Sequence, residues 1–120
     1  MTFLPRPVRE PRIPMWVGGG YPNPRPLRRA LRWDGCCFYK ETYGGPWEDM
    51  SPEDVRAPRE AAGDRPFTIA VGGAGRRDDR EAEREHTRSV ADAGADWWVE
   101  WVRPADRETM REAVERGPLV

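Results

Sequence analysis

Three consecutive glycines, Gly18, Gly19 and Gly20, are the residues of this sequence best suited by type and spacing to hold an anionic ligand. They follow an apolar stretch at residues 13–17, which predicts a strand, and precede Pro24 and Pro26, which favour the first turn of a helix. A glycine loop between a strand and a helix presents bare backbone N–H groups beside the positive helix terminus, where phosphate binds. The glycines would also serve simply to turn the chain, because the run matches neither GxGxxG nor GxxxxGK.

Two later stretches also carry candidate chemical groups near their ends. Glu100 lies among tryptophans, where a carboxylate can act as an acid, a base or a hydrogen-bond acceptor, and an ion pair with an arginine is the alternative. Gly72 and Gly73 end an apolar stretch, where they would hold phosphate or form a flexible turn. The single histidine, His86, has no second ligand at metal-binding spacing, so we predict no metal site and interpret it as a packing or interface residue.

The overall charge argues against nucleic acids and anionic membranes as partners. The net charge is −1 and the isoelectric point is about 5.9, so the chain has no strong positive field. Arg25, Arg28, Arg29 and Arg32 lie on one face of a predicted helix, a pattern more typical of a solvated helix face than of a polyanion site.

The two cysteines, Cys36 and Cys37, are adjacent, and neighbouring residues do not form an ordinary unstrained disulfide. We therefore interpret them as buried thiols in a reducing compartment. The N-terminus has no apolar core of signal-peptide length, and no apolar run is long enough to span a bilayer. The sequence therefore predicts a cytoplasmic protein.

Strands and helices alternate along the chain. The apolar patterns predict strands at residues 13–17, 34–39, 66–73 and 95–102, and helices at 24–33, 51–63, 78–93 and 104–117. Ser51 is expected to cap the second helix and Pro58 to kink it or end it early. In the last helix, Met110, Ala113 and Val114 are expected to face inward.

Such alternation predicts an α/β fold in which parallel strands are joined by right-handed crossovers. Eight βα units close a TIM (β/α)8 barrel, so four βα units correspond to half of one. A doubly wound open sheet is the alternative, but its dinucleotide fingerprint is absent. Residues 1–120 are predicted to form a single partial domain, in which residues 1–12 are an extended lead-in.

Several segments together resemble the C-terminal half of the luciferase-like monooxygenases, (β/α)8-barrel enzymes that use FMN or the deazaflavin coenzyme F-420. The segments are FLPRP at residues 3–7, PRIPMWVGGG at 11–20, RRA at 28–30, RWDG at 32–35, VGG at 71–73 and GADWWVE at 94–100. By this resemblance the four strands correspond to the fifth to eighth strands of the family barrel. By the same resemblance, the half that carries the first four strands is missing. Family residues that contact the isoalloxazine ring or the substrate are missing with it.

The resemblance implies a flavin- or deazaflavin-dependent oxidoreductase or monooxygenase acting on an unknown small organic substrate. Gly18, Gly19 and Gly20 match the family loop that helps to bind the cofactor phosphate. Lys40 lies about where some deazaflavin users place a phosphate-binding lysine, and a lone solvated loop lysine is the alternative.

Side-chain alternation along the last strand bears on the role of Glu100. If Trp98 and Glu100 point into the barrel, Trp97, Val99 and Trp101 face the helices. In that orientation the carboxylate would lie at the end of a barrel strand, where such enzymes carry out their chemistry.

The missing half suggests an alternative function. A half-barrel exposes two strand edges and a lumen face built for the absent half. The chain would then be a truncated remnant without catalysis of its own, which associates with itself as a homodimer or larger species, or with a separate complementary half-barrel.

Overall fold

The computed structural model describes residues 9–41, 47–75, 77–102 and 104–117. Most of the predicted lead-in, residues 1–8, lies outside the described residues, as do residues 42–46 of the predicted loop after Lys40. The elements are β1 (Trp16–Tyr21), α1 (Pro24–Ala30), β2 (Gly35–Glu41), β3 (Trp47–Glu48), α2 (Pro52–Ala62), β4 (Thr68–Gly72), α3 (Arg80–Asp92), β5 (Trp97–Val99) and α4 (Arg107–Glu115).

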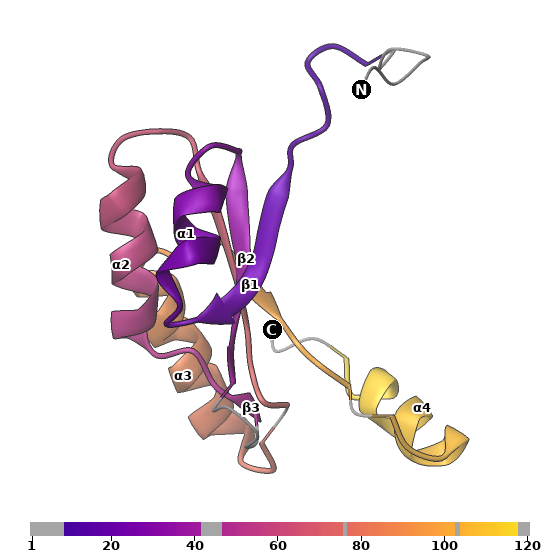
Figure 1. Ribbon diagram of the computed structural model, residues 1–120. Coiled ribbons are helices and arrows are strands. Elements are labelled where there is room, and N and C mark those ends of the chain that lie inside the picture. The colour runs from indigo at the N-terminus through magenta and orange to yellow at the C-terminus, as the bar shows by residue number, and fades with distance from the viewer. Residues whose placement is uncertain (1–8, 42–46, 76, 103, 118–120) are drawn as a thin grey trace.

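One sheet organises the chain in the order β1-β2-β4-β5, and every pair in this order is parallel. The short strand β3 pairs antiparallel with the end of β2. Helices α1, α2 and α3 lie together on one face of the sheet, whereas α4 lies apart from them (Figure 1). The predicted α/β class with parallel strands is confirmed. The described helices that cover the sheet do so from one side, unlike those of a doubly wound sheet.

The hydrophobic core lies between this sheet and the helix layer. Residues paired across parallel strands share a face, and Val17, Cys36 and Ile69 form one such row on the helix side. Phe38 and Val71 form the next row. Val55 of α2 and Val90 of α3 complete the buried cluster from the helix layer. The core therefore lies on one side of the sheet, and no helix of the described residues covers the other face.

Helix starts follow the capping residues in the sequence. The Ser51 side chain accepts a hydrogen bond from the Asp54 backbone N–H, and the Asp54 carboxylate accepts one from the Ser51 N–H, which forms a capping box. Asp79 and Asp106 cap α3 and α4 in the same general way. Of the two effects expected of Pro58, a kink or an early end, the early end does not occur, because the helix continues to Ala62 with Pro58 buried inside it.

The predicted glycine loop is a strand. Gly18, Gly19 and Gly20 belong to β1 and pair with Cys37, Phe38 and Tyr39 of β2. Pairing with β2 outweighs the low strand propensity of glycine. A Cβ at Gly19 would collide with the ring of Pro26, so this glycine lets α1 pack directly on the strand.

In the last strand, Trp98 faces the helix layer, so the condition under which Trp98 and Glu100 point into a barrel is not met. Trp98 pairs with Val71 on the helix side and contacts the His86 ring edge-on, with ring centroids 5.4 Å apart. Trp97 and Val99 point to the opposite, helix-free face, where their side chains are 58% and 43% exposed. Because β5 contains only three residues, pairing with β4 decides its orientation, and the run of bulky residues gives no alternation to read.

Helix α4 has no buried residue, in contrast to the expectation that Met110, Ala113 and Val114 face inward. Val114 is 69% exposed and Met110 is 39% exposed. The helix is amphipathic, but within the described residues its apolar side covers no part of the sheet.

Both cysteines are free thiols, and Cys36 is buried. Burial raises the pKa of Cys36 to about 12, and it also raises the pKa of Cys37. Among the described residues, no helix has the length and apolar character needed to cross a membrane.

The strand register can be tested at Gly35, which lies between Trp16 of β1 and Thr68 of β4. Gly35→Ala is expected to lower the free energy of unfolding by about 1–3 kcal/mol, because the new Cβ collides with the Thr68 carbonyl oxygen. Gly18→Ala is the matched control, since the nearest atom to its Cβ is the Cys37 carbonyl oxygen at 3.8 Å. Equal urea midpoints for the two variants would contradict the register.

Candidate functional site

A pocket of about 650 Å³ lies where β4 and β5 end and α4 follows. Parallel pairing brings the carboxyl ends of these strands to one edge of the sheet, the edge at which α/β proteins bind ligands. The pocket wall includes Gly75, Glu100 and Trp101 from the strand ends and Arg116 from the end of α4. Its size is in the range of small-molecule sites.

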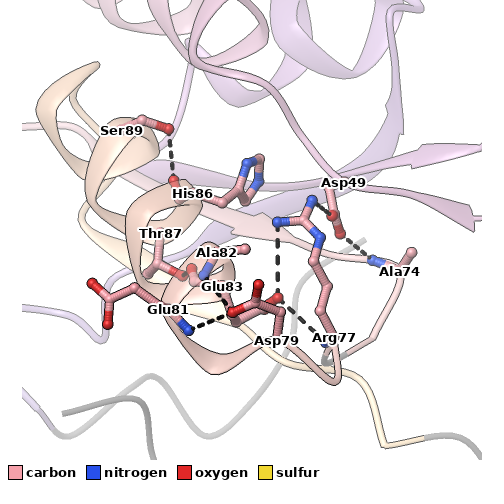
Figure 2. Close-up of polar contacts among 10 residues, drawn as sticks. All are labelled: Asp49, Ala74, Arg77, Asp79, Glu81, Ala82, Glu83, His86, Thr87 and Ser89. Atoms are coloured by element: carbon pink, nitrogen blue, oxygen red, sulfur yellow. Dashed lines mark hydrogen bonds and ion pairs between the residues drawn. The ribbon is translucent and has the colours of Figure 1, made fainter.

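Asp49, one of the residues that line this pocket, is at the centre of several polar contacts shown in Figure 2. Asp49 accepts a hydrogen bond from the Ala74 backbone N–H at 2.8 Å and a second, short one from the Arg77 guanidinium. Arg77 also lies 3.9 Å from a carboxylate oxygen of Glu83, and its backbone N–H donates to the same oxygen at 3.3 Å. Two carboxylates therefore share one guanidinium, which ties the turn after β4 to the first turns of α3.

Glu83 is the buried member of this network, with a relative exposure of 2%. A buried carboxylate is costly unless a cation and hydrogen-bond donors compensate for its lost hydration, and here Arg77 supplies both. The helix start nearby is fixed separately, because Asp79 accepts hydrogen bonds from the Glu81 and Ala82 backbone N–H groups (Figure 2).

Gly72 and Gly73, predicted to hold phosphate or to form a turn, lie next to this network. Gly72 is the last residue of β4, and Gly73 is buried with no room for a Cβ because the Trp98 ring and the Asp49 carboxylate crowd it. The next backbone N–H, that of Ala74, already donates to Asp49. In this structure the anion held by the glycine turn is therefore the protein's own carboxylate.

A stack of three aromatic rings adjoins the pocket. Tyr39 stacks on Trp47 with ring centroids 4.9 Å apart, and Trp47 stacks on Trp101 at 5.1 Å, with interplanar angles of 19° and 17°. Trp101 ends the stack and is 39% exposed. The stack therefore fixes the orientation of Trp101 while part of its surface remains accessible in the pocket wall.

Comparison of the chain with protein-family models, with curated proteins and with solved structures finds no match in any of the three. The geometry of the pocket is therefore the basis on which its function is judged.

The structure places the other predicted site residues apart from the pocket wall. Gly18, Gly19 and Gly20 lie in the edge strand β1. The start of α1 has few backbone N–H groups for a ligand, because Pro24 and Pro26 have no N–H and the N–H of Arg25 donates to the Asn23 side chain. Lys40 is an ordered strand residue at the end of β2.

Carboxylates surround the Lys40 ammonium group. Its Nζ donates to Asp54 at 3.1 Å and lies 3.9 Å from Glu48. The hydrogen bond to Asp54 raises the pKa of Lys40, so the ammonium remains charged and serves these carboxylates. The structure thus accounts for Lys40 through ion pairing between β2, β3 and α2.

His86 packs against Trp98, and its buried Nε2 atom has no hydrogen-bond partner within the described part of the chain. The described residues contain no group of three or more potential ligands arranged to hold a metal ion.

Sequence reasoning missed Asp49, Arg77 and Glu83 as a network, and Trp101 as part of a pocket. One signal was available for Glu83, because it lies three residues before His86 and seven before Val90, on the face of α3 that packs inward. No comparable pattern marks Asp49, whose partners lie 25 and 28 residues away.

The network predicts a specific effect of Asp49 on stability. Asp49→Ala is expected to lower the free energy of unfolding by about 1–3 kcal/mol, because it leaves the Ala74 N–H unpaired and Arg77 with one carboxylate fewer. Asp49→Asn should cost less, since its amide oxygen can still accept from Ala74.

Arg56→Ala is the control for this measurement. It breaks an exposed ion pair with Glu53 and should change the unfolding free energy by less than about 1 kcal/mol. Denaturant unfolding of the four proteins compares these effects, and an Asp49→Ala loss no larger than that of Arg56→Ala would contradict the network.

Proposed function

We propose that this chain is the C-terminal half of a luciferase-like (β/α)8 barrel and that the pocket at the ends of β4 and β5 binds a flavin-type cofactor, FMN or the deazaflavin coenzyme F-420. The observation that carries the proposal is the pocket itself: a site of about 650 Å³ at the carboxyl edge of a parallel sheet, lined in part by Trp101, which stacks on Trp47. Planar ring ligands bind at such surfaces by stacking.

The sheet supports the half-barrel part of this proposal. The strands follow one another in the sheet in sequence order, apart from the small strand β3, and α1, α2 and α3 all cover the same face. Consecutive right-handed βα units with every helix on one side are the construction of a (β/α)8 barrel, in which active sites lie at the carboxyl ends of the strands.

The pocket residues suit the two ends of such a cofactor. The Trp101 ring offers a flat apolar surface to an isoalloxazine or deazaflavin ring. At the α4 side of the pocket, the Arg116 guanidinium is a suitable partner for a phosphate. Arg77 already pairs with Asp49 and Glu83, so in this proposal it holds the pocket lining in place and does not bind the ligand.

Glu100 is the candidate catalytic residue of the chain. It lines the pocket next to Trp101, so its carboxylate can accept a hydrogen bond from a ring N–H group or hold a substrate proton. The bound cofactor would supply the redox chemistry, in which a hydride passes to or from the ring. The protein would then position the ring and the substrate in a pocket at the strand ends.

The test is fluorescence titration of the full chain with FMN and, separately, with F-420. Saturable binding of one of them is expected, and Trp101→Ala should weaken it about tenfold because ring stacking is lost. Trp101→Phe keeps an aromatic face and should retain most of the affinity. Far-UV circular dichroism and the thermal unfolding midpoint of each variant would show that the fold is preserved.

Trp33→Ala is the matched control, because Trp33 is also partly exposed but lies after α1, next to Arg12. It should leave cofactor affinity unchanged. Failure of both cofactors to saturate the protein, or equal losses in the Trp33 and Trp101 alanine variants, would overturn the proposed site.

A further inference from the structure

The two outer strands of the sheet each have an edge without a strand partner. In the described part of the chain, β1 pairs only with β2 and β5 pairs only with β4. Unpaired strand edges present backbone N–H and C=O groups that favour pairing with another chain. Because β1 and β5 are parallel, a β1 strand from elsewhere would continue the parallel pattern beside β5.

Helix α4 points to the same missing strand. Every earlier helix contacts the strand that follows it in the chain: α1 packs on β2, α2 packs on β4, and α3 meets β5 through His86 and Trp98. No described strand follows α4, and its apolar residues Met110 and Val114 remain exposed. A β1 strand next to β5 would give α4 the surface that the other helices already have.

The helix-free face of the sheet shows the same incompleteness. Trp16 and Trp97 lie across this face with ring centroids 6.0 Å apart, and Val99 is exposed beside them. The other positions on this face combine the large Tyr39 with smaller residues, which are Gly18, Gly20, Gly35, Cys37, Thr68, Ala70 and Gly72. In an eight-stranded barrel the interior is filled by side chains, often by alternating large and small residues. On this face Trp16 lies over Gly35 and Tyr39 lies over Gly20, so large and small residues alternate here as well.

We infer that two copies of this chain close an eight-stranded parallel barrel, in which β5 of each copy pairs with β1 of the other. A two-fold axis along the barrel makes the two new strand pairs identical, so both free edges of both copies are used and the assembly closes. The helix-free faces become the barrel interior, and each α4 lies over the junction between its own β5 and the β1 of the second copy. This inference does not depend on the cofactor.

The first measurement is the molar mass of the full chain in solution, without cofactor, by sedimentation equilibrium over a dilution series. The expected mass is twice the chain mass of 13.8 kDa. A mass of one chain at every dilution would overturn the inference. A mass that keeps growing with concentration would also overturn it, because pairing that does not close yields open-ended chains.

Two lysine substitutions test the two surfaces separately. Val99→Lys places a charge in the proposed barrel interior, and Val114→Lys places one under α4; both side chains are exposed in the single copy, so its fold should tolerate them. Each variant is expected to reduce the doubled mass to that of one chain while the far-UV circular dichroism spectrum is retained.

Glu112→Lys is the matched control for α4, because it introduces the same residue on the exposed opposite side of the helix. Glu85→Lys does the same on the exposed side of α3. Both controls should keep the doubled mass. A doubled mass in Val99→Lys would overturn barrel closure, and a doubled mass in Val114→Lys would overturn the placement of α4.

Discussion

Parallel pairing of β2 with β1 on one side and β4 on the other is the constraint on which the rest of the structure depends. Parallel strands need a crossover between them, and right-handed crossovers between consecutive strands place every covering helix on the same face. The same pairing collects the strand ends at one edge, where the pocket lies. In the described part of the chain it also leaves the second face of the sheet without helices, so only one face is covered (Figure 1).

Asp49 shows how a glycine turn at a strand end can serve the protein itself. The Ala74 N–H and the Arg77 guanidinium, groups well suited to an external anion, hold this carboxylate instead. An external phosphate at this turn would have to displace Asp49, and Arg77 would then keep only its ion pair with Glu83. Ring stacking on Trp101 requires no such exchange, and for that reason the proposed cofactor site is built around the tryptophan and not the glycines.

Local signals predicted what local interactions determine. Ser51 and Asp106 mark helix starts because their side chains bond to backbone groups two or three residues away, and the alternation of elements gave the α/β class. The strand assignment of Gly18–Gly20, the orientation of Trp97 and Trp98, and the partners of Asp49 all depend on segments far away in the sequence. The exposure of Val114 in α4 could not be predicted either, because the amphipathic pattern of a helix does not show whether anything covers its apolar side.

Helix α4 both lines the pocket and carries an exposed apolar side chain. Thr109, Ala113 and Arg116 of this segment line the pocket, while Val114 projects from it with 69% of its surface exposed. A second copy that packs against α4 would therefore also fix one wall of the pocket. Any ligand that needs this wall in place would then bind the pair more tightly than the single chain, and by linkage the ligand would favour the pair to the same extent. Assembly and ligand binding would thus be coupled, because both depend on the position of α4.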